Sequence, residues 1–390
     1  MQKSSNYDNR GVSATKPDVH NAIKGLDMGL YPKAFCKIYP DYLAGDDAFC
    51  NLMSSDGTGT KSIIAYLYYK ETGDTSVFRN ISTDVIVMNL DDLLCVGATG
   101  PFLYTSILNR NKHLIPGEII KELIAGAQEF MDTMREFNVD IKYLGGETAD
   151  LGDSVRTITV DGSMICRMAK KDLVVTSDIK PGNVIVGIAS YGKASYEKEY
   201  NSGIGSNGLT SARHDCLDKS YLEKYPETFD PNTDTSYLYI GSKKLTDKLE
   251  GTPLNVGKAL LSPTRSFAPV LHKMLLDMPG KIDSIIHNTG GALSKVLHFI
   301  DNVKIVKDNI FDTPPIFDLI QKESTTSWEE MYTVFNMGQR MEIYLDKKDA
   351  QQVINICQSF NIDAQIIGYV EASEKAEVVV KSKHGEFVYH

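Results

Sequence analysis

The sequence has few cysteines, and none of them is spaced as a metal or redox motif. The six cysteines among 390 residues never form a C-x-x-C pair, so neither a zinc site nor a disulfide-exchange site is indicated. Several lie in apolar runs, where a reduced thiol packs as a small hydrophobe. This usage favours a reducing compartment, and we expect a cytoplasmic protein.

Positive charge is also scarce. Lys and Arg number 41 against 51 Asp and Glu, giving a net charge of −10 and a pI near 5.4. Binding to nucleic acid or to an anionic membrane needs a basic excess, so neither partner is expected. No apolar run reaches 18 residues and the first 17 residues are polar, so we predict neither a transmembrane helix nor a signal peptide.

The length exceeds what one hydrophobic core usually serves, and two domains are expected. The turn Lys180-Pro181-Gly182-Asn183 separates two apolar blocks, which predicts domains at 1–175 and 176–390. Both halves mix strand and helix patterns, so the fold class is α/β or α+β. Residues 190–255, rich in Ser, Tyr, Lys, Asn and Asp, predict a long exposed insertion.

Hydrophobic periodicity predicts the main elements. The expected strands cover 48–53, 102–108, 140–144, 155–168 (with a turn near Asp161-Gly162), 184–189, 282–287, 341–345 and 364–369. The expected helices cover 62–70, 83–96 (capped by Thr83-Asp84), 116–137, 267–276, 294–299 and 348–360.

A glycine-containing segment between a strand and a helix is the first chemical motif. It reads Asp56-Gly57-Thr58-Gly59-Thr60-Lys61. Its glycines let backbone N–H groups approach a phosphate at a helix N-terminus, and Lys61 adds a point charge. It is not a Walker A motif, because Thr60 precedes the lysine. Taken alone, a plain glycine turn explains the segment equally well.

The next cue is acidic. Asp84 and Asp91 are seven residues apart and share a helix face, with Asp92 beside them. Such carboxylates could hold Mg²⁺ through oxygen ligands. A solvated helix face with an Asp cap is the simpler explanation of this cue by itself.

Three further segments are chemically suggestive but individually weak. Gly145-Gly146-Glu147-Thr148 follows a predicted strand, Ser206-Asn207-Gly208 opens a predicted helix, and His287-Asn288-Thr289-Gly290-Gly291 precedes another. Each is explained as well by a capped turn.

Taken together and in this order, these segments resemble the phosphoribosylformylglycinamidine cyclo-ligase family, also called aminoimidazole ribonucleotide synthetases. The likeness spans nearly the whole chain, and no single motif carries it. The matching segments are YDNRGV (7–12), DGTGTK (56–61), TDVIVMNLDDLLCVGATG (83–100), YLGGETAD (143–150), GSNGLTSAR (205–213), LSPTR (261–265), HNTGGAL (287–293) and MYTVFNMGQRM (331–341).

The resemblance implies a two-domain α/β (α+β) fold. In it the N-terminal mixed sheets of two subunits pair into a barrel across a homodimer, and a C-terminal α/β domain completes the substrate cleft. It also implies ATP-dependent cyclisation of formylglycinamidine ribonucleotide to aminoimidazole ribonucleotide, with ADP and phosphate, in purine synthesis. ATP would activate the formyl-amide oxygen as a phosphate ester, and the neighbouring nitrogen would then displace phosphate.

The resemblance also implies residue roles, since phosphoryl transfer depends on positioning and charge stabilisation. ATP would contact Gly57, Thr58, Gly59, Thr60 and Lys61, and Mg²⁺ would bind Asp56, Asp84, Asp91 and Asp92. Lys61, Asp92 and Asn207 would be catalytic. The substrate would contact Glu147, Ser206, Asn207, Gly208, Thr289, Gly290 and Gly291.

The chain departs from the family pattern in several places. Where the family has a glycine-rich lid, this chain reads Tyr42-Leu43-Ala44-Gly45-Asp46-Asp47, with one glycine. Gly205 stands in place of the family's His before Ser-Asn-Gly, and His214 is a candidate substitute for that His. Where the family usually has an Asn-Asp pair, this chain has Asp91-Asp92. Ala292 stands in place of a third glycine after Thr-Gly-Gly, and Gln339-Arg340 stands in place of an apolar residue followed by glycine.

Other readings remain open from the sequence. One is a non-catalytic, nucleotide-binding paralogue, and another is a related ATP-dependent enzyme with a different substrate. A selenophosphate-forming enzyme would need a reactive Cys near a Lys, and Cys36-Lys37 is the one loose match.

Overall fold

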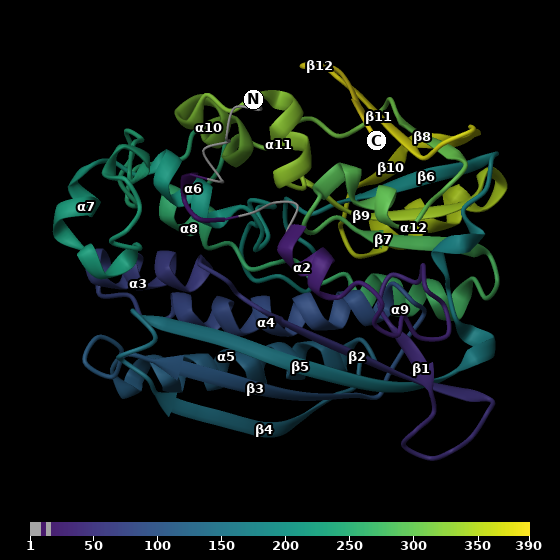
Figure 1. Cartoon of the computed structure of the whole chain (residues 1–390), viewed down its shortest axis with the longest axis horizontal. Coiled ribbons are helices and arrows are strands. Elements are labelled where there is room, and N and C mark those ends of the chain that lie inside the picture. The colour runs from purple at the N-terminus through teal and green to yellow at the C-terminus, as the bar shows by residue number, and fades with distance from the viewer. Residues whose placement is uncertain (1–8, 13–16) are drawn as a thin grey trace.

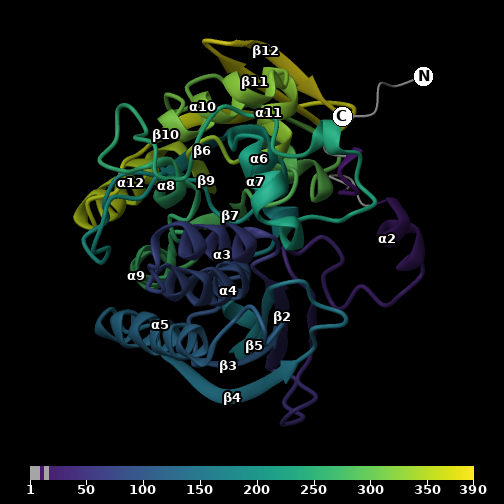
Figure 2. The same cartoon turned by 90° about the vertical axis from the view of Figure 1, so that its left-hand side faces the viewer.

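The computed structural model describes residues 9–12 and 17–390, and Tyr7 and Asp8 of the YDNRGV motif lie outside them. Two sheets with intervening helices build the molecule in layers, as the two views at right angles show (Figures 1 and 2). We call the part through β5 the N-terminal half and the part from β6 onward the C-terminal half. This is a two-domain α/β fold with mixed sheets, as expected.

The N-terminal half contains a five-stranded sheet in the order β1-β2-β5-β3-β4. Helices α3, α4 and α5 lie between this sheet and the C-terminal half (Figure 2). The short helix α2 (Pro17–Ala22) precedes the sheet. The elements are β1 (Ile38–Pro40), β2 (Phe49–Gly57), α3 (Lys61–Thr72), α4 (Val77–Leu94), β3 (Phe102–Arg110), α5 (Gly117–Glu136), β4 (Ile141–Asp150) and β5 (Ile158–Ala169).

The C-terminal half contains a seven-stranded mixed sheet in the order β12-β11-β8-β10-β6-β9-β7. Only β11 and β8 pair in parallel there. Its strands are β6 (Asn183–Ala189), β7 (Ile282–His287), β8 (Val303–Lys307), β9 (Gln339–Asp346), β10 (Ala364–Ala372), β11 (Glu377–Ser382) and β12 (Gly385–Tyr389). Its α-helices are α6 (Leu209–Cys216), α7 (Ser220–Lys224), α8 (Val256–Leu260), α9 (Ala268–Asp277), α10 (Pro315–Ser324), α11 (Trp328–Val334) and α12 (Ala350–Ser359).

Helix α4 differs from the sequence expectation because it lies at the centre of the molecule. It begins at Val77, six residues before the predicted cap at Thr83-Asp84, and Asp84 instead bonds to other segments. Nearly all of its residues are buried, since the sheet covers one side and the C-terminal half the other. A helix buried all round shows no polar stripe, whereas amphipathic α5 was predicted within one residue at each end.

Three other local expectations were wrong. Strand β4 runs through Gly145-Gly146-Glu147 instead of ending there, because it pairs with β3 up to Asp150. Residues Asp161-Gly162 lie within β5 and pair with both β2 and β3, so there is no turn. The helix expected at 294–299 is a 3-10 helix, Ala292–His298.

The 190–255 region was expected to be an exposed insertion, but it has its own buried aromatic cluster. Tyr221, Tyr225 and Tyr239 are each at most 4% exposed, and the rings of Tyr221 and Tyr239 stack 5.9 Å apart. The region therefore packs as an integral part of the C-terminal half.

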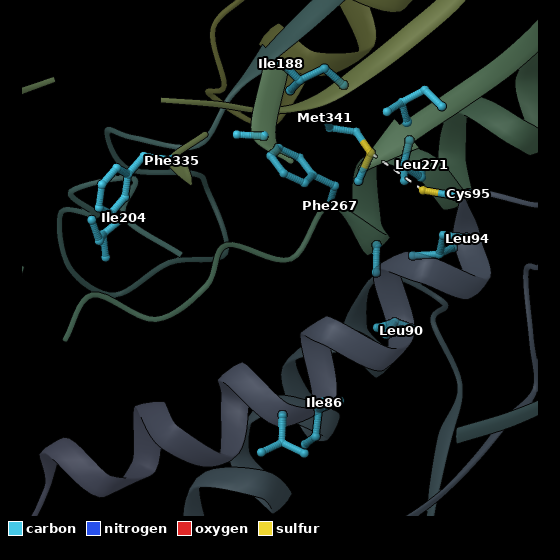
Figure 3. Packing of buried hydrophobic residues seen from close by; sticks show 14 of the residues in the cluster. Ile86, Leu90, Leu94, Cys95, Ile188, Ile204, Phe267, Leu271, Phe335 and Met341 are labelled. Carbon is cyan, nitrogen blue, oxygen red and sulfur yellow. Dashed lines mark hydrogen bonds between the residues drawn. The ribbon is translucent and has the colours of Figure 1, made fainter. Parts of the chain in front are cut away.

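A continuous hydrophobic core joins the two halves. Leu94 and Cys95 at the end of α4 meet Phe267, Leu271 and Met341, with Cys95 Sγ 4.0 Å from Met341 Sδ (Figure 3). Fully burying one such side chain stabilises the fold by about 1.5–3 kcal/mol. This packing holds the C-terminal half against α4.

The outer face of the N-terminal sheet is left open. Strand β3 alternates buried and exposed residues, with Leu103 and Ile107 pointing outward. Met53 on β2 and Leu144 on β4 are exposed too. The five strands form no closed barrel within this chain. None of the helices in the described part of the chain is both long and apolar enough to cross a membrane.

A candidate active site around helix α4

Helix α4 brings together most of the motifs that the sequence singled out. Its polar side chains contact the starts of the DGTGTK helix, the LSPTR segment, the HNTGG loop and the NMGQR strand. We call Lys61, Asp84, Asp91, Asp92, His287 and Arg340 the charged seam, because they lie where the halves meet.

Lys61 and Asp84 form a fully buried ion pair. Lys61 Nζ lies 2.8 Å from Asp84 Oδ1 and 2.6 Å from the Ser262 carbonyl oxygen. Asp84 Oδ1 also accepts the backbone N–H of Thr264 at 2.6 Å. Burial lowers the pKa of Lys61, and the Asp84 carboxylate opposes that effect. The described geometry thus gives Lys61 protein partners in place of the expected phosphates.

Asp91 is held by three donors from the C-terminal half. It accepts hydrogen bonds from Ser266 Oγ at 3.1 Å and from the Phe267 N–H at 3.2 Å. Arg340 Nη2 lies 3.2 Å from Oδ2, the same carboxylate oxygen that accepts the Phe267 N–H. Burial raises the pKa of Asp91, with Arg340 as the largest opposing influence. Two departures from the family pattern, at 91 and 340, therefore compensate each other's charge.

Asp92 is the acid of the seam that remains accessible. Its side chain is 24% exposed and lies 2.8 Å from Nδ1 of the fully buried His287. Burial raises the pKa of Asp92 to about 7 and lowers that of His287 well below its usual value. A neutral His287 can donate its Nδ1 proton to the carboxylate. Phe35 covers this pair, with its ring 6.4 Å from that of His287.

The two glycine loops meet beside the seam. Thr60 Oγ1 of DGTGTK lies 2.8 Å from Thr210 Oγ1 in the first turn of α6. Ser206 Oγ lies 2.9 Å from Thr264 Oγ1. Gly208 has a φ of +76°, and a Cβ there would lie 2.4 Å from the Phe335 ring. Only glycine fits this turn without strain, and it, not Ser206 or Asn207, is the N-cap of α6.

The HNTGG loop is held from below by a buried polar network. Glu342 Oε1 accepts from Lys307 Nζ at 2.5 Å and from Asn288 Nδ2 at 2.8 Å. Lys307 also donates to the Leu293 carbonyl at 2.7 Å. Thr289 is 8% exposed and Gly290 is exposed, so the loop presents backbone toward solvent while Asn288 anchors it.

Some of the predicted site residues lie apart from this cluster. Glu147 is exposed on the edge strand β4, and the structure brings none of the seam residues to it. Asp56 is exposed on β2, while its carbonyl accepts from Asn89 Nδ2 of α4 at 3.3 Å. Among residues 9–12 and 17–390, no three His, Cys, Asp or Glu side chains are arranged to hold a metal ion.

Two places where the chain departs from the family pattern, the lid region and the candidate substitute His214, are both held by local hydrogen bonds. The region of the glycine lid is a loop pinned by Asp41, which accepts hydrogen bonds from Arg167, Asn51 and the Ala44 and Asp46 N–H groups. His214 is 2% exposed and bonded to Arg213 and to the Tyr239 N–H, so it does not reach the seam.

Sequence reasoning missed Arg340, Glu342, Lys307 and Asp41 as organising residues. Their long-range partners lie between 14 and 249 positions away, and periodicity does not report such contacts. One signal for the contact between Asp91 and Arg340 was available in the sequence. Both positions depart from the family pattern, one by adding an acid and the other by adding a base.

A cavity of about 380 Å³ is lined in part by the LSPTR segment. Helices α4 and α5 form one wall of it, and residues 196–201 and 254–266 form the other. Thr264 and Ser266, which bond the seam carboxylates, are among its lining residues. None of the predicted ATP or substrate residues lines it.

Comparison with known proteins defines the class first. Residues 45–168 match the N-terminal domain of AIR synthase related proteins, and residues 239–381 match the C-terminal domain. Among solved structures, a chain of the HypE–HypF complex superposes with a TM-score of 0.56 at 14% identity, covering 96% of this chain and 99% of that one. Thermotoga maritima PurL complexed with FGAR gives a TM-score of 0.52 at 14% identity, covering 96% and 49%. These likenesses show the fold.

Sequence relatives then define the family. The phosphoribosylformylglycinamidine cyclo-ligase of Methanocaldococcus jannaschii is 31% identical over 89% of this chain and 83% of its own length. That of Staphylococcus carnosus is 30% identical over 84% and 82%. The chain belongs to the phosphoribosylformylglycinamidine cyclo-ligase family.

Proposed function

We propose that this chain catalyses the ATP-dependent cyclisation of formylglycinamidine ribonucleotide to aminoimidazole ribonucleotide, releasing ADP and phosphate, as a step of purine synthesis. The amide oxygen takes the γ-phosphoryl group of ATP, the neighbouring nitrogen attacks the activated carbon, and that oxygen leaves as part of inorganic phosphate. Family membership over most of the chain supports this reaction.

The observation that carries the proposal is the meeting of the motifs at α4. Segments that are weak singly, and up to 249 residues apart, touch one another through Asp84, Asp91 and Asp92. A purely structural role does not call for such a cluster, because replacing a buried ion pair by well-packed apolar residues is often neutral or stabilising. This favours an enzyme over a non-catalytic paralogue.

ATP is assigned to the loop of Gly57, Thr58, Gly59 and Thr60 that opens α3. The positive φ of Gly59 (+53°) and the position of the loop at the N-terminus of α3, where Thr60 makes no side-chain cap, support this assignment. Lys61 binds the ATP phosphates directly if its ammonium group leaves Asp84 when ATP binds. If the ion pair persists, Lys61 acts by holding Asp84 in place.

Mg²⁺ is assigned to Asp56 and Asp92, with the nucleotide phosphates. Mg²⁺ in ATP sites commonly uses one or two carboxylates together with phosphate oxygens and water. Both side chains are accessible, which fits such a partial ligand set. Asp84 and Asp91 fit less well, because Lys61 and Arg340 already neutralise them.

The substrate is assigned to the opposite loops. Ser206, Asn207 and Gly208 precede α6, and Thr289, Gly290 and Gly291 precede the 3-10 helix. Asn207 is partly exposed, as expected for a group that orients the reacting amide. Asp92 keeps its catalytic assignment through the Mg²⁺ that its partly exposed carboxylate would hold.

The open face of the N-terminal sheet leads us to propose a homodimer. Glu147, on edge strand β4, would contact a substrate only in the site of the other subunit of that dimer. Exposed apolar side chains on β2, β3 and β4 support this pairing. We keep 1–175 and 176–390 as the domain limits, which fall between β5 and β6, and the cytoplasm as the compartment.

The alternative with a reactive Cys36 is disfavoured. Burial, followed by the Asp92 carboxylate, raises the pKa of the Cys36 thiol far above its usual value. A thiolate nucleophile needs the opposite shift.

The proposed function is tested by ADP release from purified protein with ATP and Mg²⁺, with and without formylglycinamidine ribonucleotide. We expect release that depends on the ribonucleotide. Release at the same slow rate in both mixtures would overturn the proposal.

A further inference from the structure

Arg340 carries donors that the protein leaves unused. The residue is 2% exposed, and its Nη2 bonds to Asp91 and to the Arg265 carbonyl oxygen. Its Nε and Nη1 are buried without any hydrogen-bond partner. Leaving a buried donor unpaired costs about 1–3 kcal/mol, and more when it is charged. A guanidinium in this state is expected to have a further partner in the working enzyme.

The stem of Arg340 lies beside the position that a side chain at residue 205 would take. A Cβ added to Gly205 would lie 3.6 Å from Arg340 Cδ and 3.4 Å from Asn336 Nδ2. Asn336 Nδ2 in turn donates to the carbonyls of Gly203 and Ile204, both at 3.1 Å. The strand that bears Arg340 is therefore tied to the segment that leads into Ser206 and Asn207.

The backbone of Arg340 is tied to the other substrate loop. Its carbonyl oxygen accepts the N–H of Asn288 at 2.7 Å, next to Thr289. Through its side chain it also contacts the Arg265 carbonyl, one residue after Thr264. Arg340 thus contacts the LSPTR segment and the HNTGG loop, and its stem lies next to Gly205.

Asp91 holds the guanidinium by a single nitrogen. Its second oxygen accepts from Ser266 Oγ, so Asp91 is itself fixed and does not compete for Nε or Nη1. Other basic groups nearby are committed elsewhere: Lys61 binds Asp84, and Arg265 binds Glu197 at 2.6 Å. Among the cations of the seam, Arg340 is the one whose side chain has nitrogens without any hydrogen-bond partner in the described part of the chain.

We propose that Arg340 binds an acceptor oxygen of the ribonucleotide substrate through its Nε and Nη1, beside the segment that leads into Ser206 and Asn207. The inference rests on the proposed function, of which it names a binding residue. Arginine suits the task because its fixed, planar donors match phosphate and carboxylate-like oxygens. Two sources of that oxygen share this chemistry: the 5′-phosphate, and the amide oxygen that accepts the phosphoryl group.

The test removes both charges together, because Arg340→Gly alone would leave Asp91 buried without compensation. The double variant Asp91→Asn/Arg340→Gly is compared with wild type and with Arg340→Lys. Lys258→Gln, which removes a half-buried cation of α8, serves as the matched control. Thermal unfolding shows that each variant is folded before binding of ribose 5-phosphate, KM and kcat are measured.

A 5′-phosphate partner predicts at least tenfold weaker ribose 5-phosphate binding and a tenfold higher KM in the double variant, with kcat retained. A reacting-oxygen partner predicts unchanged ribose 5-phosphate binding and a kcat at least tenfold lower. In both cases, Lys258→Gln behaves as wild type. A folded double variant with wild-type binding, KM and kcat would overturn the proposal. Failure of the proposed function would show separately, as wild-type protein that forms no product.

Discussion

Buried charges at single positions hold this site together more than the glycines that first mark it in the sequence. Asp84 illustrates this, because one oxygen accepts both Lys61 Nζ and the Thr264 N–H. The sequence predicted that Asp84 and Asp91 share a helix face, and they do. It could not predict their partners, since Ser262, Thr264 and Arg340 come from distant parts of the chain.

Removing Lys61 is expected to destabilise the protein strongly. Lys61→Met leaves Asp84 charged and uncompensated, which costs about 3–5 kcal/mol for a buried pair. Lys61→Met/Asp84→Asn is expected to recover much of that loss, because Asn keeps an acceptor for Thr264. Urea unfolding measures both variants, with Lys70→Met at the exposed end of α3 as the control. Losses that simply add in the double variant would contradict the pairing.

Asp41 is expected to confer pH-dependent stability. Burial opposes its ionisation, but hydrogen bonds from Arg167 and Asn51 outweigh burial and lower its pKa. The stabilisation is therefore present above the unfolded-state pKa of about 4 and is lost as pH falls through the folded value. Asp41→Asn should unfold at lower urea than wild type at pH 7, and the gap should narrow below pH 4. An equal gap at both pH values would count against this role.

At the scale of elements, the bounds of a helix were easier to predict from the sequence when one side of the helix faces solvent. Helix α5 was predicted well because solvent on one side imposes an apolar stripe, whereas α4 was started six residues late because it is covered on both sides. Strand β4 was cut short because its two glycines suggested a turn. In the structure Gly146 instead permits close strand pairing, since a Cβ there would lie 1.9 Å from the Ser106 carbonyl oxygen.

Gly146→Ala is therefore expected to push β4 from β3 and to destabilise the protein by about 1–3 kcal/mol, the usual cost of overpacking. Thr148→Ala, on an exposed position of the same strand, should change stability by less than about 0.5 kcal/mol. Thermal unfolding of both variants makes the comparison. Equal midpoints would show that the strands accommodate a methyl group there.

At the scale of the molecule, the sequence predicted two mixed α/β parts and the order of the motifs, but not their meeting point. That point depends on the C-terminal half packing onto α4 through Phe267, Leu271 and Met341 (Figure 3). The open face of the N-terminal sheet gives the molecule a second apolar surface, on the side away from this contact (Figure 1).

Charge placed on that face is expected to dissociate the proposed dimer. Ile107→Lys/Leu144→Lys should sediment at the monomer mass where wild type sediments as a dimer, because paired sheets would bury both lysines. Leu276→Lys, on the exposed side of α9, is the matched control and should stay dimeric. A double variant that remains dimeric would place the interface elsewhere.

The central claim is that the amide oxygen of the substrate leaves as part of phosphate. Formylglycinamidine ribonucleotide labelled with ¹⁸O at the formyl-amide oxygen tests it directly, with inorganic phosphate analysed by mass spectrometry after turnover with ATP and Mg²⁺. The account predicts one ¹⁸O atom in each phosphate formed, alongside aminoimidazole ribonucleotide. Unlabelled phosphate would mean that water, not the amide oxygen, had accepted the phosphoryl group, and would contradict it.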